Sequence, residues 1–361
     1  MTKMHEATKL GQSIWLDYMH RTMLKSGELK QLIDAGLRGI TSNPTIFEEA
    51  IGSGDAYDDA MRKMVEEGKS VGEMYQGLVV EDIRNAADQL RPIYAESQGN
   101  DGYVSLEADP NLAYDTWATV EEVHQLRALV DRPNVMFKVP ATGAGIPAIS
   151  QLISEGININ ITLMFSLSHY EAVADAYLRG LEKRAANGEA LNQVASVASF
   201  FVSRVDTLID KKLGEIGKRD LQGKIGIANA KMAYARYLTI FSSERWQQLE
   251  RQGARPQRIL YGSTSAKNPA YPDTLYIDNL MGANTVNTLP RKAIDALLDH
   301  GVIASGLTEN LDEARRQINQ LAGLGLNLEV LTQHLQDEGV EKFAKDFAKL
   351  SDAIARKREQ F

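Results

Sequence analysis

The stretch Val135–Met164 reads VMFKVPATGAGIPAISQLISEGININITLM and contains a strand, a helix and a second strand. Its first part, VMFKVP, is short and apolar and ends at proline, which is typical of a buried strand that stops at a loop. The segment IPAISQLISEG has the spacing of an amphipathic helix, and ININITLM is the next strand candidate. This order predicts two neighbouring parallel strands joined by a helical crossover.

Strand and helix patterns alternate in this way along most of the chain. Amphipathic segments such as TVEEVHQLRALVD separate the apolar runs, and no Pro/Ser-rich linker divides the sequence. Alternation of this kind predicts an α/β protein with a parallel sheet. The predicted strands cover residues 13–19, 38–45, 103–110, 135–142, 157–165, 196–204, 258–265 and 284–290.

Eight strands favour a single (β/α)8 barrel, the TIM barrel, formed by residues 1–361 with additional helices at both termini. The charged helical segment from about residue 307 is expected to pack outside the barrel, where it can cap one end. An open doubly wound sheet is the alternative fold. It favours a glycine fingerprint after an early strand, whereas TGAGIPAI supplies only two glycines of such a pattern.

The composition restricts the classes of function. The 361 residues include 40 basic and 48 acidic ones, a formal net charge of −8, which argues against a broad nucleic-acid surface. Cysteine is absent, and the six histidines form no HxxH or HExxH pair, so we expect no metal and no cofactor. The N-terminus has no apolar signal-peptide core and no apolar run approaches about 20 residues, so we expect a cytoplasmic protein without a membrane partner.

Polar side chains recur on one face of the predicted strands, near their C-terminal ends. Strand side chains alternate between two faces, and in ININITLM this places Ile157, Ile159, Ile161 and Leu163 opposite Asn158, Asn160 and Thr162. Five other strands repeat the arrangement, pairing Trp15 with Asp17, Thr41 with Asn43, Ser105 with Glu107, Met136 with Lys138, and Ser199 with Phe201. Barrel enzymes build their sites from such strand ends, so the set predicts an active site.

Lys138 is the member of this set that most needs an explanation, because it lies within an apolar strand. Burying an ammonium costs free energy unless the group is paired or neutralised. Desolvation lowers the pKa of an amine, and a deprotonated lysine can attack a ketone to form a Schiff base, which accepts electrons from a breaking carbon–carbon bond. The alternative is an ion pair with Glu107 or Asp17 that only holds the barrel together. That alternative does not explain the accompanying Asn43, Asn160, Thr162 and Ser199.

Seven motifs in this chain, taken in their order, match a known family. They are WLDYMHR from Trp15, GITSNPTIF from Gly39, VSLEADP from Val104, FKVPAT from Phe137, NINITLMFS from Asn158, SFFVSRVD from Ser199 and TVNTLP from Thr285. With these motifs the chain resembles the transaldolases over nearly its whole length. The order of the motifs, with their Asn-Pro, Lys and Asn-x-Thr elements, is highly specific, whereas each motif alone is weak.

The resemblance implies a role for each matched residue. Transaldolases move a three-carbon dihydroxyacetone unit between sugar phosphates in the non-oxidative pentose phosphate pathway. By this pattern Lys138 forms the Schiff base, Asp17 is the general base for the C4 hydroxyl, and Glu107 with Thr162 holds a catalytic water. The implied substrate-binding residues are Asn43 and Asn160 for the three-carbon unit, and Ser199, Arg204 and Lys267 for the phosphate. Some transaldolases have arginine at the position of Lys267.

Phe201 bears on the choice between two related reactions. The resemblance extends to fructose-6-phosphate aldolase, which carries a tyrosine at this position and releases free dihydroxyacetone. A phenylalanine has no hydroxyl with which to protonate the enamine, so Phe201 favours transfer from sedoheptulose 7-phosphate to glyceraldehyde 3-phosphate. Two alternatives stay open: cleavage of the aldolase type, and a sugar-phosphate-binding barrel without catalysis. The expected partners are sugar phosphates and no nucleic acid, and the protein is expected to be a monomer or a homodimer.

Overall fold

The computed structural model describes residues 1–52 and 54–361, and in this part of the chain eight parallel strands close into a barrel. Each strand pairs with the next in the sequence, and the barrel closes where β1 pairs with β8. The prediction of a (β/α)8 barrel is therefore confirmed, and the open doubly wound sheet is excluded. The strands are β1 Gln12–Asp17, β2 Gly39–Thr41, β3 Tyr103–Glu107, β4 Val135–Pro140, β5 Ile159–Met164, β6 Ser196–Phe201, β7 Arg258–Gly262 and β8 Thr285–Leu289.

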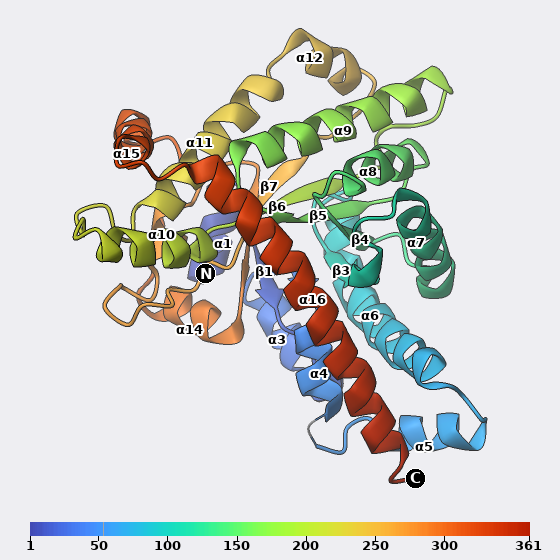
Figure 1. The fold of residues 1–361 in the computed structure, drawn as a ribbon. Coiled ribbons are helices and arrows are strands. Elements are labelled where there is room, and N and C mark those ends of the chain that lie inside the picture. Colours follow the sequence, from blue (N-terminus) through green and yellow to red (C-terminus); the bar gives the residue numbers. More distant parts are fainter. Residues whose placement is uncertain (53) are drawn as a thin grey trace.

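Helices surround the barrel and extend beyond it at both ends of the chain (Figure 1). Those from the first half of the chain are α1 Lys3–Lys9, α2 Arg21–Ser26, α3 Glu28–Asp34, α4 Pro44–Gly52, α5 Asp58–Glu66, α6 Val71–Glu96, the 3₁₀ turn η1 Pro110–Leu112, α7 Thr116–Val130, α8 Gly145–Ser154 and α9 Leu167–Ala186. The later ones are α10 Ser203–Glu215, α11 Ile225–Ile240, α12 Glu244–Glu250, α13 Leu275–Asn279, α14 Arg291–His300, α15 Leu311–Gly323 and α16 Leu328–Arg358. None of the helices in the described part of the chain is long and apolar enough to cross a membrane.

The predicted alternation of side chains holds for most of β5 and fails at one residue. Ile157, Ile159 and Ile161 pack into the main apolar core, as expected. Leu163 was predicted to share their face, and this was wrong: it packs in a separate cluster with Phe165. The backbone of Leu163 is left-handed, with φ +56°, and the register between β5 and β6 shifts between Ile161 and Met164. An irregularity of this kind re-aims a side chain, which a strict two-residue period cannot anticipate.

The second strand is shorter than the sequence indicated. We predicted residues 38–45, whereas β2 covers only Gly39–Thr41. The chain leaves the sheet because Asn43 begins a helix: its side-chain oxygen accepts a hydrogen bond from the backbone N–H of Ile46 at 3.0 Å. Proline suits the first helical position, where no backbone N–H is needed, so Pro44 starts α4.

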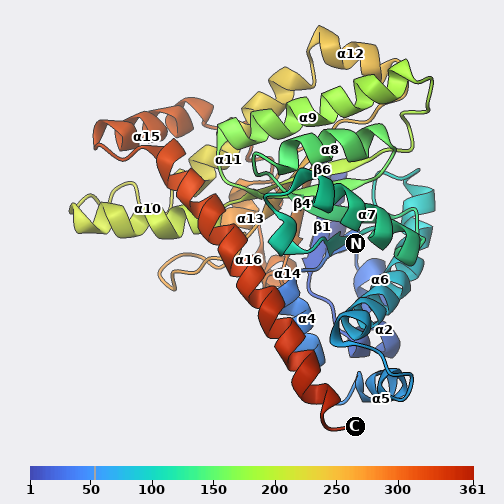
Figure 2. The same ribbon diagram turned by 45° about the vertical axis from the view of Figure 1, so that its right-hand side comes forward.

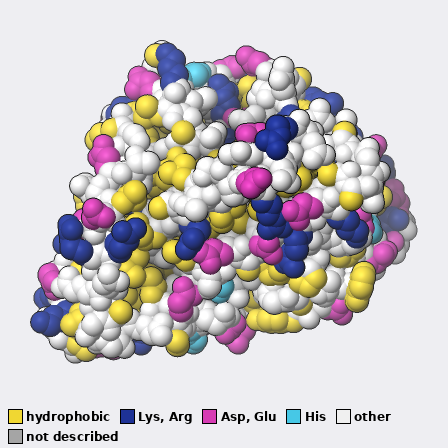
Figure 3. Space-filling view, turned by 90° about the horizontal axis from the view of Figure 1, so that it is seen from above, with side chains coloured by type: hydrophobic (Ala, Val, Ile, Leu, Met, Phe, Trp, Pro, Cys, Tyr) yellow, Lys and Arg dark blue, Asp and Glu magenta, His cyan; other side chains and the backbone are white. Residues whose placement is uncertain are grey.

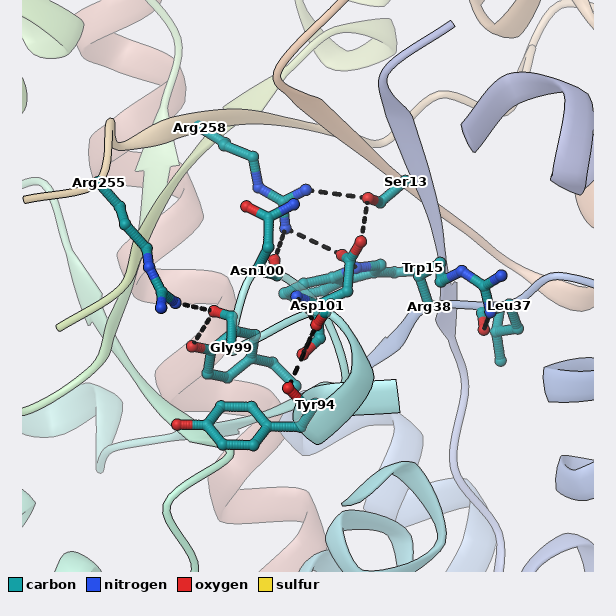
Figure 4. Close-up of polar contacts among 12 residues, drawn as sticks. Ser13, Trp15, Leu37, Arg38, Tyr94, Gly99, Asn100, Asp101, Arg255 and Arg258 are labelled. Carbon is teal, nitrogen blue, oxygen red and sulfur yellow. Dashed lines mark hydrogen bonds and ion pairs between the residues drawn. The ribbon is translucent and has the colours of Figure 1, made fainter. Parts of the chain in front are cut away.

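Polar side chains close the N-terminal end of the barrel, and an aromatic layer separates them from its other end. The guanidinium of Arg258 on β7 contacts Asp101 at 3.0 Å and donates to Ser13 on β1 at 2.9 Å (Figure 4). The indole of Trp15 packs against this group of side chains and donates a hydrogen bond to Asp101 at 3.4 Å. A Cβ on Gly39 would come within 2.5 Å of that indole ring, so the barrel interior here has room only for glycine.

The long helix α16 crosses the barrel mouth diagonally, from the side of α15 to the side of α5 (Figures 1 and 2). The side-chain amide of Gln336 donates to the carbonyl oxygens of Ala141 at 3.0 Å and Leu163 at 2.9 Å, which follow β4 and end β5. Further along, Thr45 of α4 donates to Asp346 at 2.8 Å. These contacts fix the helix over the C-terminal ends of the strands.

The surface carries charges of both signs. On the face drawn in Figure 3, Lys and Arg side chains lie among Asp and Glu side chains, with apolar areas between them.

Candidate active site

A cavity of about 310 Å³ opens at the C-terminal ends of the barrel strands. Its wall includes eight residues predicted from the sequence: Asp17, Asn43, Lys138, Thr162, Ser199, Phe201, Arg204 and Lys267. The other two, Glu107 and Asn160, contact members of this wall from just beneath it. The structure therefore brings all the predicted residues together at one end of the barrel.

Lys138 lies in the cavity wall with its side chain almost wholly buried, at 6% exposure. Its Nζ lies 2.6 Å from Oε2 of Glu107 and donates to the backbone carbonyl of Ser42 at 2.9 Å. The ion pair that we considered as a purely structural alternative is thus present. Burial raises the pKa of Glu107, and the charge of Asp17 adds to this effect, while Lys138 opposes it. A carboxylate with a raised pKa is suited to take a proton from the amine beside it.

Asp17 ends β1 and faces the same cavity. Thr41 lies opposite it on β2 and donates a hydrogen bond from Oγ1 to Oδ1 at 2.7 Å. Burial raises the pKa of Asp17, and the charge of Lys138 and the hydrogen bond from Thr41 oppose this rise. The same Thr41 hydroxyl lies 2.7 Å from the hydroxyl of Thr288 on β8. A half-buried carboxylate with a raised pKa can serve as a general base.

Two neighbouring polar residues of β5 differ in their contacts. Thr162 is fully buried, and its hydroxyl has no hydrogen-bond partner among the described residues. Asn160, by contrast, donates to the hydroxyl of Ser105 at 2.9 Å and accepts from that of Ser199 at 2.6 Å. A buried polar group without a partner is costly, so the Thr162 hydroxyl is available for a substrate or a water. The hydroxyl of Ser199 donates its hydrogen to the side-chain amide of Asn160 and is therefore not free to donate to a substrate.

Another part of the wall is basic. Arg204 stands in the first turn of α10, and Lys267 is exposed on the loop between β7 and α13. The guanidinium carbon of Arg204 lies 5.2 Å from the ring centre of Phe201, which stacks on Phe165. These two cations, one half-buried and one exposed, can bind a phosphate by bidentate and point-charge contacts.

Sequence reasoning missed several residues of this wall. The hydroxyl of Ser265 is buried, lines the cavity and has no hydrogen-bond partner among the described residues. Its position three residues after the end of β7, in RILYGSTS, was a signal that could have identified it. Phe343 and Lys342 also line the cavity, but they belong to α16, and no local pattern connects that helix to the strand ends. Across residues 1–52 and 54–361, no cluster of His, Cys, Asp or Glu could hold a metal ion.

Comparison with known proteins agrees with this geometry. A sequence model described as Transaldolase/Fructose-6-phosphate aldolase matches residues 14–354. A protein named Transaldolase from Thermobifida fusca is 47% identical over 358 residues, which cover 98% of this chain and 97% of the relative. Proteins of the same name from Trichodesmium erythraeum and Thiobacillus denitrificans are 44% and 46% identical, covering 98% and 96% of this chain and 96% and 97% of their own lengths. The chain belongs to the transaldolase/fructose-6-phosphate aldolase family.

Proposed function

We propose that this protein is a transaldolase, a transferase that moves dihydroxyacetone from sedoheptulose 7-phosphate to glyceraldehyde 3-phosphate, giving erythrose 4-phosphate and fructose 6-phosphate. The observation that carries the proposal is the buried Lys138 amine in a cavity wall, with a carboxylate of raised pKa at 2.6 Å and a second carboxylate in the same wall. The family and the relatives named Transaldolase support the same activity.

Lys138 starts the reaction by attacking the C2 carbonyl of the donor. Glu107 takes the ammonium proton first, and the carbonyl oxygen then leaves as water after protonation, so that a cationic iminium remains. The buried hydroxyl of Thr162, which lacks a protein partner among the described residues, fits a role in holding the water that exchanges these protons with Glu107. No metal is needed, because the iminium nitrogen accepts the electrons of the next step.

Asp17 acts in the cleavage step. It takes the proton of the C4 hydroxyl while the C3–C4 bond breaks, and the electron pair of that bond forms the enamine as the iminium nitrogen becomes neutral. The aldose leaves, and the acceptor aldehyde is attacked by the same carbon in reverse. We assign Asn43 and Asn160 to the hydroxyl groups of the three-carbon unit, since both present amides near Lys138.

The phosphate is assigned to the basic part of the wall. Arg204 and Lys267 supply the positive charge, and we add Ser265, whose unpartnered hydroxyl lines the cavity with them. Ser199, which the sequence assigned to the phosphate, donates to Asn160, a contact that favours a place beside the three-carbon unit. The lysine at position 267 offers a point charge where an arginine would offer a fork.

Cleavage of the aldolase type is the second candidate, because it uses the same Schiff base. Phe201 lines the cavity and stacks on Phe165, so this position offers the enamine an apolar ring and no hydroxyl. An enamine that is not protonated waits for an aldehyde acceptor, and we therefore favour transfer.

The domain organisation, the location and the partners of the protein are also inferred. We propose one domain comprising residues 1–361, since α15 and α16 pack on the elements of the barrel. A cytoplasmic location and the absence of a nucleic-acid partner fit the acidic, cysteine-free composition.

Intact-mass analysis after incubation with fructose 6-phosphate and borohydride tests the proposal. We expect a reduced dihydroxyacetone adduct that peptide mapping places on Lys138, and erythrose 4-phosphate as acceptor should then yield sedoheptulose 7-phosphate. An adduct with release of free dihydroxyacetone and no transfer would favour cleavage. No adduct on a folded protein that binds the sugar would reject the Schiff-base route.

A further inference from the structure

We propose that Phe343, on the C-terminal helix α16, forms an aromatic roof over the reactive nitrogen of Lys138, which stabilises the cationic iminium and keeps water from the enamine. The inference rests on the proposed Schiff-base chemistry. It extends that chemistry to a helix that contributes no residue to the barrel itself.

The geometry places the ring next to the reacting atom. The ring centre of Phe343 lies 5.9 Å from Nζ of Lys138, within the range of a cation–π contact. Both residues line the same cavity, and Phe343 is only 6% exposed. Nζ also contacts Oε2 of Glu107 and the carbonyl of Ser42, so the ring adds an apolar face beside these polar groups.

The helix that carries Phe343 is held in place on both sides of this residue. About two turns towards its N-terminus, Gln336 donates to the carbonyl of Ala141, which follows β4, and to that of Leu163 near the end of β5. In the following turn, Asp346 accepts a hydrogen bond from Thr45 of α4 and contacts Lys342. Gly339 lies so close to the barrel that a Cβ would stand 2.8 Å from a methyl of Leu163. A ring supported in this way has little freedom to leave the site.

The charge on the nitrogen changes during the reaction, and an aromatic face responds to that change. After Glu107 has taken the ammonium proton, the neutral amine that attacks the ketone becomes a cationic iminium, and the negative face of the ring stabilises that charge. When the C3–C4 bond breaks, its electron pair enters the enamine and the nitrogen becomes neutral. A water that then protonated C3 would regenerate an iminium, and its hydrolysis would release free dihydroxyacetone. An apolar ring offers no proton and excludes water, so it favours waiting for an acceptor.

Two substitutions separate these effects, and the helix offers a matched control. Phe343→Leu keeps an apolar roof without the π face, whereas Phe343→Ala removes both. Phe347, one turn further along α16, packs on Tyr75 at 5.1 Å between ring centres and is not part of the cavity wall. Phe347→Leu therefore makes the same truncation on the same helix away from Lys138. A Phe343→Tyr variant retains the π face but adds a hydroxyl, so it is compared with Phe343→Leu by its trapped fraction alone.

The experiment measures two quantities on each full-length variant: the fraction trapped by borohydride at fixed fructose 6-phosphate, and free dihydroxyacetone released per transfer to erythrose 4-phosphate. We expect Phe343→Leu to weaken adduct formation about fivefold, as a cation–π contact of ordinary strength implies. Phe343→Ala should in addition raise the release-to-transfer ratio, while Phe343→Tyr restores the trapped fraction and Phe347→Leu changes neither quantity. If the wild type forms the adduct but Phe343→Leu and Phe347→Leu give equal trapped fractions, the role of Phe343 is wrong and the proposed function is not affected. A wild type that forms no adduct would instead overturn the proposed function.

Discussion

Lys138 and Glu107 face each other across β4 and β3, with 2.6 Å between Nζ and Oε2. Both side chains are buried, so removing one of them would leave the charge of the other without a partner. In the proposed mechanism a proton moves from Lys138 to Glu107, and a neutral amine beside a neutral carboxyl group needs no counter-charge. The same contact thus fits both a stable resting state and the first catalytic step.

The proton acceptor is tested by Glu107→Gln. The amide keeps the shape of the side chain but cannot take the ammonium proton, so we expect adduct formation to slow by about 100-fold. Rapid mixing with fructose 6-phosphate followed by borohydride and mass analysis measures the rate. An unchanged rate would assign the proton to another group.

The hydrogen bond from Thr41 to Asp17 predicts a shift in the pH dependence. It lowers the pKa of the Asp17 carboxyl, which burial raises. In the proposed mechanism Asp17 acts as a carboxylate, so activity is expected above its pKa and should be lost as pH falls through it. In Thr41→Val the pKa rises further, and the acid limb of kcat/KM should move to higher pH. Thr288→Val, which removes a neighbour of Thr41 that makes no described contact with Asp17, is the control. If the acid limb of kcat/KM in Thr41→Val stays at the pH of the wild type, that limb reports the titration of a group other than Asp17.

Thr162→Val separates catalysis from stability. The buried Thr162 hydroxyl has no partner among the described residues, so an isosteric valine should leave the free energy of unfolding within about 1 kcal/mol of wild type, or raise it. We expect kcat to fall by about 10- to 100-fold, because the water that we propose for proton transfer would lose a ligand. Urea denaturation and steady-state kinetics measure the two quantities. A destabilised variant with normal kcat would show that the hydroxyl is structural.

The polar group that closes the N-terminal end of the barrel, Arg258 with Asp101 and Ser13, is expected to affect the stability of the protein but not its kcat. In Arg258→Met the buried Asp101 carboxylate loses its ion-pair partner, so the free energy of unfolding should fall by about 3 kcal/mol. The buried cluster that contains Trp15, Tyr103 and Met136 separates this group from Lys138. We therefore expect kcat to stay at the wild-type value below the melting temperature. Urea unfolding with activity assays on the folded protein checks both. A large loss of kcat in the folded variant would connect this polar group to the site.

Asp206 makes stability depend on pH. It is buried in α10, and burial raises its pKa to about 7. Because the unfolded pKa is near 3.9, the folded state binds this proton more tightly, and the protein loses stability as pH rises from about 4 to about 7. Asp206→Asn keeps an acceptor for the Gly226 N–H, 2.6 Å away, without the charge. Between pH 5 and pH 8 the variant should gain at least about 1 kcal/mol over wild type in urea unfolding. A constant difference would mean that Asp206 does not titrate in this range.

The sequence by itself determined the order of strands and helices and the inner face of most strands. A two-residue period in a strand is a local property, so the inward positions of Asp17, Glu107 and Lys138 followed directly from it. Boundaries were less certain, because β2 ends where Asn43 caps a helix, and the left-handed Leu163 interrupts the period in β5. The Asn43 cap is a local signal that the strand prediction overlooked, whereas the shift at Leu163 depends on how β5 pairs with β6.

The tertiary structure alone decided which distant residues meet. Phe343 reaches Lys138, and Thr288 reaches Thr41, because barrel closure and the path of α16 bring together segments with no local relation. Burial is also a property of the whole fold, and it raises the pKa of both Asp17 and Glu107. The sequence supplied the chemical groups, whereas the closed barrel removed them from water and set the distances on which their reactivity depends.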